Sequence, residues 1–244
     1  MAMGQNDRFR LQTARMDHAQ AAAAGIDVGL RSYMLRVYNY MCIGLALTGA
    51  VAFAASTSGE LMNAIHGTAL RWVVMLAPLG FVFYLSARIH SMKAATAQTV
   101  FWVYAGLMGL SLSYIFLAFT GESIVRVFFI TSAAFAGLSL YGYTTKKDLS
   151  GFGTFLVMGV IGILIASVVN IFLESSALHF AISALGVLIF AGLTAYDTQR
   201  IKAIYAAGDH SETHEKKAIM GALTLYLDFI NMFIFMLQFF GNRE

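Results

Sequence analysis

Long apolar stretches alternate with short polar ones along nearly the whole chain. An α-helix needs about 20 apolar residues to cross the hydrocarbon core of a bilayer, and in lipid its backbone satisfies its own hydrogen bonds. The pattern therefore predicts an all-α integral membrane protein, with an N-terminal arm at 1–32 and a transmembrane domain at 33–244. The seven stretches that approach the required length lie at 33–56, 70–87, 96–118, 124–143, 152–173, 178–197 and 221–240.

Composition agrees with this prediction, because only 12% of the residues are charged, against roughly a quarter in soluble globular domains. The net charge is +3, but no basic and aromatic pattern typical of nucleic-acid binding accompanies it, and membrane topology explains the basic residues. We expect the lipid bilayer as a partner, no nucleic acid and no cofactor. The single cysteine, Cys42, excludes a disulfide within the chain.

The basic residues fall mainly on one side of the predicted helices. Thirteen of the 16 Lys and Arg residues lie in the arm through Arg36 and in the connections at 88–95, 144–151 and 198–220. Since these residues are enriched in cytoplasmic loops, we expect the N-terminus in the cytoplasm and, after seven crossings, the C-terminus outside. The arm has no apolar core close behind its first basic residues, unlike a cleaved signal sequence. A surface-bound amphipathic helix is a weakly patterned alternative for it.

Two carboxylates stand within apolar stretches, Asp197 at the end of the sixth and Asp228 inside the seventh. A charged side chain at the bilayer centre costs on the order of 3 kcal/mol on insertion scales, so such residues usually face a partner or water. Counted from Gly221, Asp228 lies roughly 10 Å into its helix, while Asp197 lies at the cytoplasmic end of the preceding one. Either the last helix begins well outside the bilayer, or a vestibule enters the protein from the cytoplasm.

Polar residues accompany each carboxylate along one face of its predicted helix. The two faces meet if the helices are antiparallel neighbours. We expect Thr194, Thr224, Asn231 and Gln238 to line a pore, although Ser, Thr and Asn inside membrane helices more often hydrogen-bond to a neighbouring helix. The face of the seventh helix comprises Gly221, Thr224, Asp228, Asn231, Phe235 and Gln238, and that of the sixth comprises Ser183, Phe190, Thr194 and Asp197.

Two carboxyl groups within hydrogen-bonding distance tend to share one proton, because both cannot ionise without repulsion. Loss of that proton pushes the two helices apart and leaves carboxylate oxygens, which suit Ca²⁺. The sequence thus points to Asp197 and Asp228 as a pH-sensing and gating pair and as ligands of Ca²⁺. The structural alternative is that each carboxylate is satisfied locally, Asp197 by the following loop and Asp228 by a neighbouring helix.

Three segments of the chain resemble the Bax inhibitor-1 family, also called the transmembrane Bax inhibitor motif family. They are AYDTQRIK at 195–202, LTLYLDFINMFIFMLQFFG at 223–241 and TKKDLS at 145–150. The resemblance covers about residues 30–244 and agrees with the count of seven helices. It implies a fold in which helix 7 is central and wrapped by the other six. Because the resemblance is to bacterial members, it implies a location in the inner membrane.

The resemblance also implies a function, a pH-sensitive calcium leak in which Asp197 and Asp228 are the paired aspartates that control a closed and an open state. Ca²⁺ is then the transported ion and a partner. Bacterial members also include regulators of a membrane-bound AAA protease, so the alternative is a non-conducting role in membrane-protein quality control. A family arginine that pairs with the aspartates corresponds to Arg88 in YLSARIHSMK, for which a surface arginine that only sets topology is the alternative.

Two further patterns suggest other chemistry. His210 and His214 have the i, i+4 spacing of a metal site, but GDHSETHEKK is polar throughout and lacks a third ligand, so we expect a solvated loop. Intramembrane aspartyl proteases also use two aspartates on successive helices, the first after a tyrosine, as in Tyr196–Asp197. The residues LYLDF around Asp228 lack the glycine that flanks such a catalytic aspartate, so we do not expect an enzyme.

Overall fold

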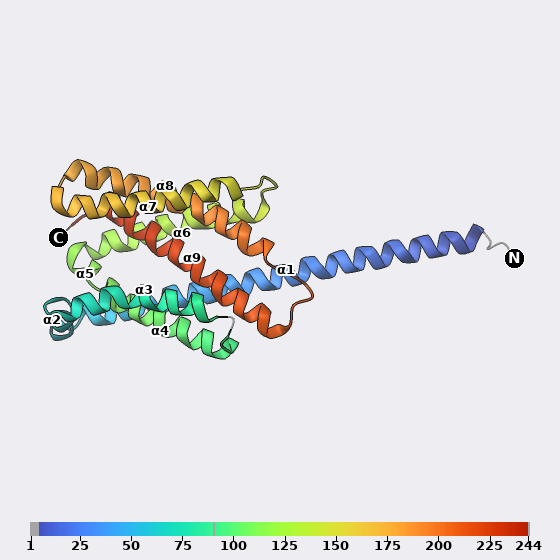
Figure 1. Cartoon of the computed structure of the whole chain (residues 1–244), viewed down its shortest axis with the longest axis horizontal. Helices are drawn as coiled ribbons and strands as arrows, with labels where there is room; N and C mark the ends of the chain where they lie inside the picture. Colours follow the sequence, from blue (N-terminus) through green and yellow to red (C-terminus); the bar gives the residue numbers. More distant parts are fainter. Residues whose placement is uncertain (1–4, 90, 244) are drawn as a thin grey trace.

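The computed structural model describes the backbone of residues 5–89 and 91–243 and the side chains of 28–89 and 91–243. Within these residues the chain is helical, with one isolated β-bridge between Phe119 and Arg243 and no strand. Seven helical segments are long and apolar enough to cross a membrane, which confirms the predicted fold class and number of spans. The helices (Figure 1) are α1 (Gln5–Ser56), α2 (Gly59–His66), α3 (Leu70–Arg88), α4 (Ala94–Leu112), α5 (Ile115–Ala118), α6 (Gly121–Thr144), α7 (Ser150–Leu173), α8 (Ser176–Ala203) and α9 (Ser211–Phe240).

Several helix ends lie where the sequence supplies a cap. Ser58, Thr120 and Ser175 each accept a hydrogen bond from the backbone N–H three residues later, at the starts of α2, α6 and α8. α7 ends at Leu173, and the next residue, Glu174, has a left-handed backbone with φ of 47°, a conformation common just after a helix. Pro78 lies inside α3, where it removes one backbone hydrogen bond without ending the helix. Local chemistry therefore accounts for most of the turns between spans.

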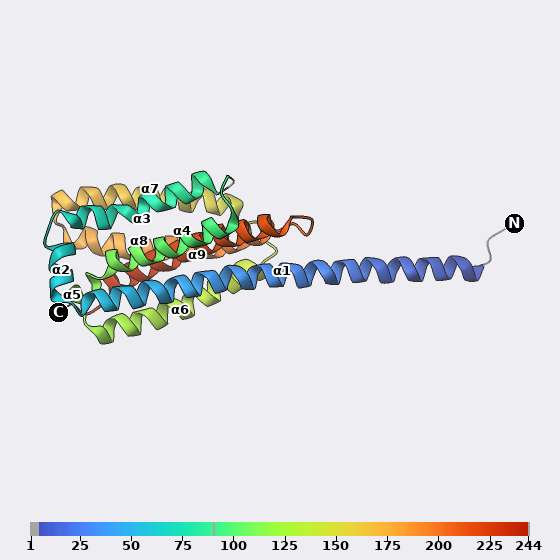
Figure 2. The same ribbon diagram turned by 90° about the horizontal axis from the view of Figure 1, so that it is seen from below.

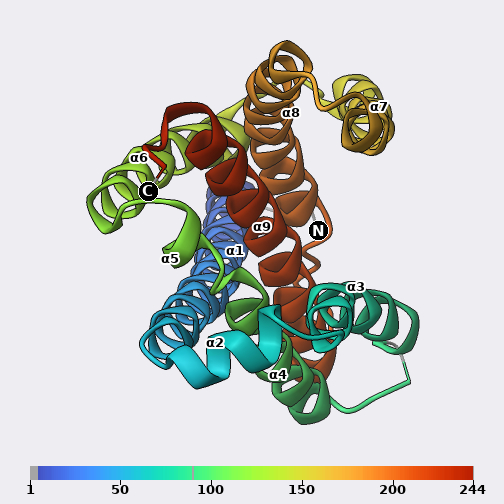
Figure 3. The same ribbon diagram turned by 90° about the vertical axis from the view of Figure 1, so that its left-hand side faces the viewer.

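The helices differ in how much of their surface other helices cover. In α9, 67% of the residues in its most apolar stretch are buried, whereas in α7 only 11% are. α9 packs mainly against α1, α4, α6 and α8, while α3 packs on α4 and α7 on α8. Figure 3, a view along the bundle, shows α3 and α7 at its edge. Enclosure of the last span by all six others, which the family resemblance implies, stays a prediction.

α1 joins the predicted arm to the first span without a break. It runs from Gln5 to Ser56, and Figure 2 shows its first part extending alone beyond the bundle. Residues 1–4 and the side chains of 5–27 lie outside the described residues, so the amphipathic alternative and the boundary at 32 stay predictions. The beginning of α1 and the end of α9 lie at opposite ends of the molecule, as seven crossings require (Figure 1). Which end faces the cytoplasm also stays a prediction.

The connection between the last two spans is much shorter than predicted. α8 continues to Ala203 and α9 begins at Ser211, so the loop expected at 198–220 shrinks to 204–210. The prediction was wrong because it counted only the apolar part of each helix. Polar residues extend both helices beyond their apolar stretches, and long polar side chains at the ends of membrane helices reach toward water and lipid headgroups.

Candidate functional site

α8 and α9 form the most extensive helix pair among the described residues. At one level Ser183 Oγ donates to Gln238 Oε1 at 3.4 Å. At the next level the rings of Phe190 and Phe235 stack, with 5.8 Å between their centroids. Gly186 permits this approach, because a Cβ atom there would overlap the Phe235 ring. The two faces predicted from the sequence therefore meet.

Asp197 of α8 and Asp228 of α9 meet at a third level of the same contact. Their carboxyl groups are near enough to interact with each other, and the two residues are only 8% and 4% exposed. Because ionised carboxylates are acceptors only, a hydrogen bond between the two groups would need one proton. The buried Oδ2 of Asp228 has no hydrogen-bond partner among the described groups. The two carboxyl groups therefore lie close together, and Oδ2 of Asp228 is not satisfied by a different helix. The sharing of a proton between them stays a prediction.

The pair lies inside both helices, away from their ends. Asp197 is about 9 Å before the end of α8 and Asp228 about 26 Å after the start of α9, at 1.5 Å per residue. The placement of Asp197 at the very end of its helix was therefore wrong. The last helix begins at Ser211, well before its apolar stretch, while the choice between a start outside the bilayer and a cytoplasmic vestibule stays a prediction.

Among the described side chains, Arg200 acts on Asp197, whereas Arg88 does not act on either aspartate. Arg200 lies one turn after Asp197 on α8 and interacts with it electrostatically. Arg88 is exposed at the end of α3, and α3 packs mainly on α4 and α2. The described ion pairs do not include it. The latch contact implied by the resemblance is therefore absent from the described residues in this structure.

Three of the expected pore-lining residues are satisfied within their own helices. The side chains of Thr194, Thr224 and Asn231 each donate to the carbonyl four residues earlier, at 2.8, 3.0 and 2.8 Å. For Asn231 this contradicts the expectation of a bond to a neighbouring helix, since the carbonyl one turn back is its acceptor. Only Gln238 bonds across the contact, to Ser183. All four side chains are engaged in this state.

The connection between α6 and α7 is fastened to α8 by residues to which the sequence assigned no role. Gln199 Nε2 donates to the carbonyl of Lys147 at 2.7 Å, and Gln199 Oε1 accepts from the N–H of Leu149 at 2.9 Å. Lys202 Nζ donates to the carbonyl of Tyr143 at 2.7 Å. The segments AYDTQRIK and TKKDLS therefore form one structural unit that holds α8 beside the pair. Their joint presence in the family resemblance was the available signal.

A row of hydroxyl groups connects three helices next to the pair. The hydroxyl of Tyr38 on α1 hydrogen-bonds to Ser139 Oγ on α6 at 2.5 Å, and Ser139 Oγ to Thr198 Oγ1 on α8 at 2.9 Å. Thr198 Oγ1 in turn donates to the carbonyl of Thr194 at 2.7 Å. Ser139 and Thr198 are buried. The row ends on the residue that follows Asp197, so it helps to fix the position of α8.

The polar stretch that holds His210 and His214 is divided between the connection and α9: His210 lies in the exposed connection, as expected, whereas His214 lies in the first turns of α9, so the expected loop was wrong for His214. Helix α9 starts at Ser211, directly after His210. The His214 ring lies 6.3 Å from that of Tyr33 and 5.3 Å from that of Tyr205, measured between centroids. No group of three or more His, Cys, Asp and Glu residues placed to hold a metal occurs in the described part of the chain.

Comparison with known proteins agrees with this arrangement. The model of the family described as "Inhibitor of apoptosis-promoting Bax1" matches residues 30–244. The inner membrane protein YbhL of Escherichia coli strain K12 is 46% identical over 219 residues, which cover 88% of this chain and 94% of that protein. A protein of Caulobacter vibrioides is 48% identical over 247 residues, which cover 97% of this chain and 99% of that protein.

The matched region contains the aspartate pair, the contact between α8 and α9 that carries it, and the connection that Gln199 fastens. Its seven spans agree with the description of YbhL as an inner membrane protein. The chain therefore belongs to the Bax inhibitor-1 family of integral membrane proteins.

Proposed function

We propose that the protein is a pH-sensitive calcium leak channel of the inner membrane, gated by proton occupancy of Asp197 and Asp228. The observation that carries this proposal is the proximity of two carboxyl groups that are both buried in the membrane domain. In the proposed closed state the two groups share one proton, because a hydrogen bond between them needs one. A change of pH that removes the proton acts directly on the packing of α8 against α9.

Loss of the proton leaves two negative charges side by side. At a separation of about 4 Å and an effective dielectric constant of about 20, their repulsion is about 4 kcal/mol, which Arg200 offsets in part. Separation of the two helices relieves this repulsion, and so does a cation between the carboxylates. Ca²⁺ takes about six to eight oxygen ligands, so two carboxylates with water as the remaining ligands form a weak site. A weak site suits an ion that has to leave again.

The stacked rings of Phe190 and Phe235 form the barrier in the proposed closed state. They lie between the aspartate pair and the Ser183–Gln238 hydrogen bond along the contact of α8 with α9. An apolar constriction of this kind blocks ions because it excludes water. When the helices separate, the rings move apart and the polar side chains of Thr194, Thr224, Asn231 and Gln238 become available to line a path. Arg88 has no part in this state.

The distribution of basic residues favours an N-terminus in the cytoplasm. In this orientation the end of α8 that carries Asp197 faces the cytoplasm, because the connection 204–210 lies at the same end of the molecule as the extension of α1 (Figure 1). We therefore propose that cytoplasmic pH sets the proton occupancy of the pair.

Calcium flux into proteoliposomes tests the proposal. We expect the initial rate of the wild type to rise between about pH 6 and pH 8, by at most about tenfold per pH unit, since a single proton controls it. In Asp197→Asn and Asp228→Asn a neutral amide replaces one of the two carboxyl groups, so two negative charges can no longer repel each other. Each variant is therefore expected to give a low flux that does not depend on pH. Asp148→Asn makes the same chemical change at an exposed loop carboxylate and should keep the wild-type response.

Wild-type flux with an unchanged pH response in both variants of the pair contradicts the gating role. Absence of flux from the wild type, together with co-purification of a membrane-bound AAA protease, favours the non-conducting regulator in its place. Cleavage of a membrane-helix substrate that Asp228→Asn abolishes points to a protease and overturns the channel proposal.

A further inference from the structure

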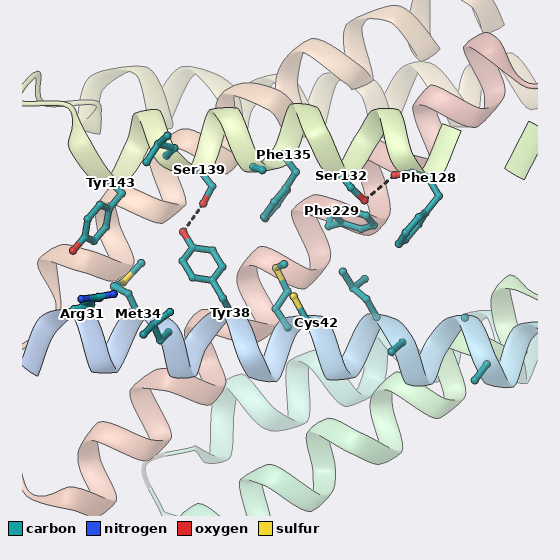
Figure 4. Close-up of a pocket in the computed structure, with 18 residues that line it drawn as sticks. Arg31, Met34, Tyr38, Cys42, Phe128, Ser132, Phe135, Ser139, Tyr143 and Phe229 are labelled. Atoms are coloured by element: carbon teal, nitrogen blue, oxygen red, sulfur yellow. Dashed lines mark hydrogen bonds between the residues drawn. The ribbon is translucent and has the colours of Figure 1, made fainter. Parts of the chain in front are cut away.

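A groove with a volume of about 910 Å³ runs between α1 and α6. The two helices both pack on α9 but make little direct contact with each other. Phe229 of α9 forms part of the floor (Figure 4). Leu35 and Leu140, which line the groove, are 52% and 63% exposed, so the groove opens on the surface that faces the bilayer.

The groove is apolar along most of its length and polar at one end. Its inner hydroxyl groups already have partners, since Ser132 donates to its own helix at 2.8 Å and Tyr38 bonds to Ser139. At one end Arg31 lies next to Tyr143 (Figure 4). This distribution of polar groups matches an occupant with an apolar tail and a polar head.

Two cations lie at the polar end of the groove. Arg31 and Tyr143 both line the groove. Lys202 lies beside them, with its Nζ 5.0 Å from the centre of the Tyr143 ring and bonded to the Tyr143 carbonyl. The described ion pairs use Arg36, Lys216 and Lys217, so no described carboxylate neutralises either cation. The distribution of basic residues assigns this end to the cytoplasm, where anionic lipid headgroups attract Lys and Arg.

The dimensions of the groove favour a lipid over a protein helix. From Arg31 to Ala50 the lining residues of α1 extend over about 28 Å, close to the roughly 30 Å of the hydrocarbon core. The hydrogen bond between Tyr38 and Ser139 joins the two walls (Figure 4). A helix with a diameter of about 10 Å cannot lie between walls that are joined in this way, whereas a flexible acyl chain bends past the bridge.

We propose that this groove binds one acyl chain of an anionic glycerophospholipid whose phosphate lies between Arg31 and Lys202. The site is separate from the aspartate pair, and its existence does not depend on calcium conduction. The phosphate neutralises two cations at the membrane surface, and the acyl chain covers the apolar walls between α1 and α6.

Photo-crosslinking of the full-length protein tests the acyl-chain part of the proposal. Phosphatidylglycerol with a photoreactive group in the middle of one acyl chain should label residues 41–50 and 128–136. Gly49 lies in the groove and has open space where a Cβ atom would be, so Gly49→Leu fills the groove without strain and should lower this labelling about fivefold or more. Gly106→Leu, at an equally open glycine of α4 outside the groove, should label like the wild type.

Competition with phosphatidylcholine of the same chain length tests the headgroup. The wild type should prefer phosphatidylglycerol, and Arg31→Gln with Lys202→Gln should lose about fivefold of this preference for each charge removed. Lys146→Gln with Lys147→Gln removes two charges at the same end of the bundle but outside the groove, and should keep the preference. Thermal unfolding in detergent verifies that all variants are folded.

Three results would overturn the proposal. Equal labelling by the two lipids in the wild type removes the role of Arg31 and Lys202. Labelling that Gly49→Leu leaves unchanged places the acyl chain elsewhere. A crosslink through this face to a second copy of the chain identifies the groove as a contact between copies instead of a lipid site.

Discussion

α7 and α9 both cross the membrane, yet they occupy opposite environments. α7 is the most apolar span and contains no Asp, Glu, Lys or Arg, and 11% of its apolar stretch is buried. α9 carries Asp228 inside its apolar stretch, and 67% of that stretch is buried. In this protein the most apolar helix is therefore the least covered by other helices.

The solvent explains this inversion. In water, apolar surface drives helices together, but lipid tails are as apolar as leucine and give no such force. A carboxyl group in lipid costs several kcal/mol, so the helix that carries one is buried among others. Among the membrane spans, intramembrane polar groups mark the interior better than hydropathy does.

A carboxylate on the exposed face of α7 should have the largest effect. Leu164 is 61% exposed, and Asp at this position has no described partner, unlike Asp228. We expect Leu164→Asp to make membrane insertion of α7 less favourable by about 3 kcal/mol, as measured by a glycosylation-based insertion assay. Leu164→Val is the control and should insert like the wild type. In the folded protein, equal yields of the Asp and Val variants would reveal a protein surface that covers this face.

The second-largest effect is expected when side-chain volume is added in these two environments. A Cβ atom at Gly186 of α8 overlaps the Phe235 ring of α9, whereas Gly162 of α7 faces open space. Gly186→Leu should therefore destabilise the protein by about 2–3 kcal/mol through overpacking, as measured by thermal unfolding in detergent. Gly162→Leu should remain near the wild type. Similar melting temperatures for the two variants would contradict the tight contact between α8 and α9.

Removal of the Gln199 side chain should have a moderate effect. Its two hydrogen bonds join α8 to the connection before α7, and together they contribute about 1–2 kcal/mol. Gln199→Ala should lower the free energy of unfolding by that amount, while Gln98→Ala on α4 serves as the control. An unchanged stability of Gln199→Ala would mean that apolar packing alone holds α7 and the connection in place.

The smallest expected effect is a pH dependence of stability that arises in α2, outside both α7 and α9. His66 of α2 hydrogen-bonds to Ser113 Oγ at 2.9 Å, and burial lowers the pKa of His66 from its ordinary value of 6.5. Above pH 6.5 the His66 ring is neutral in both the folded and the unfolded protein and does not change the stability. Below that pH the unfolded protein binds a proton at His66 more readily than the folded protein does, so the stability falls. Melting temperatures at about pH 7.5 and pH 5.5 should differ less for His66→Gln than for the wild type. An equal difference would assign the dependence to other groups.

The sequence alone determined the number of spans and identified the two carboxylates that meet. Span length follows from bilayer thickness, which is the same for every helix. The meeting of Asp197 and Asp228 follows from two polar faces on consecutive antiparallel helices, so it needed no knowledge of the other five. The polar stretch at 198–220 was misjudged because hydropathy marks where lipid ends and does not mark where a helix ends.

Only the tertiary structure decided which helices are neighbours, and several residues depend on that choice. Arg88 lies apart from the pair because α3 packs on α4. Gln199 bonds to the connection after α6, and Lys202 bonds to the last turn of α6, which lie 50 and 59 residues earlier in the chain. The groove between α1 and α6 exists because both helices pack on α9 and leave a gap between them. In lipid, helix pairing depends on close packing and hydrogen bonds between particular side chains, and a single sequence does not show those partners.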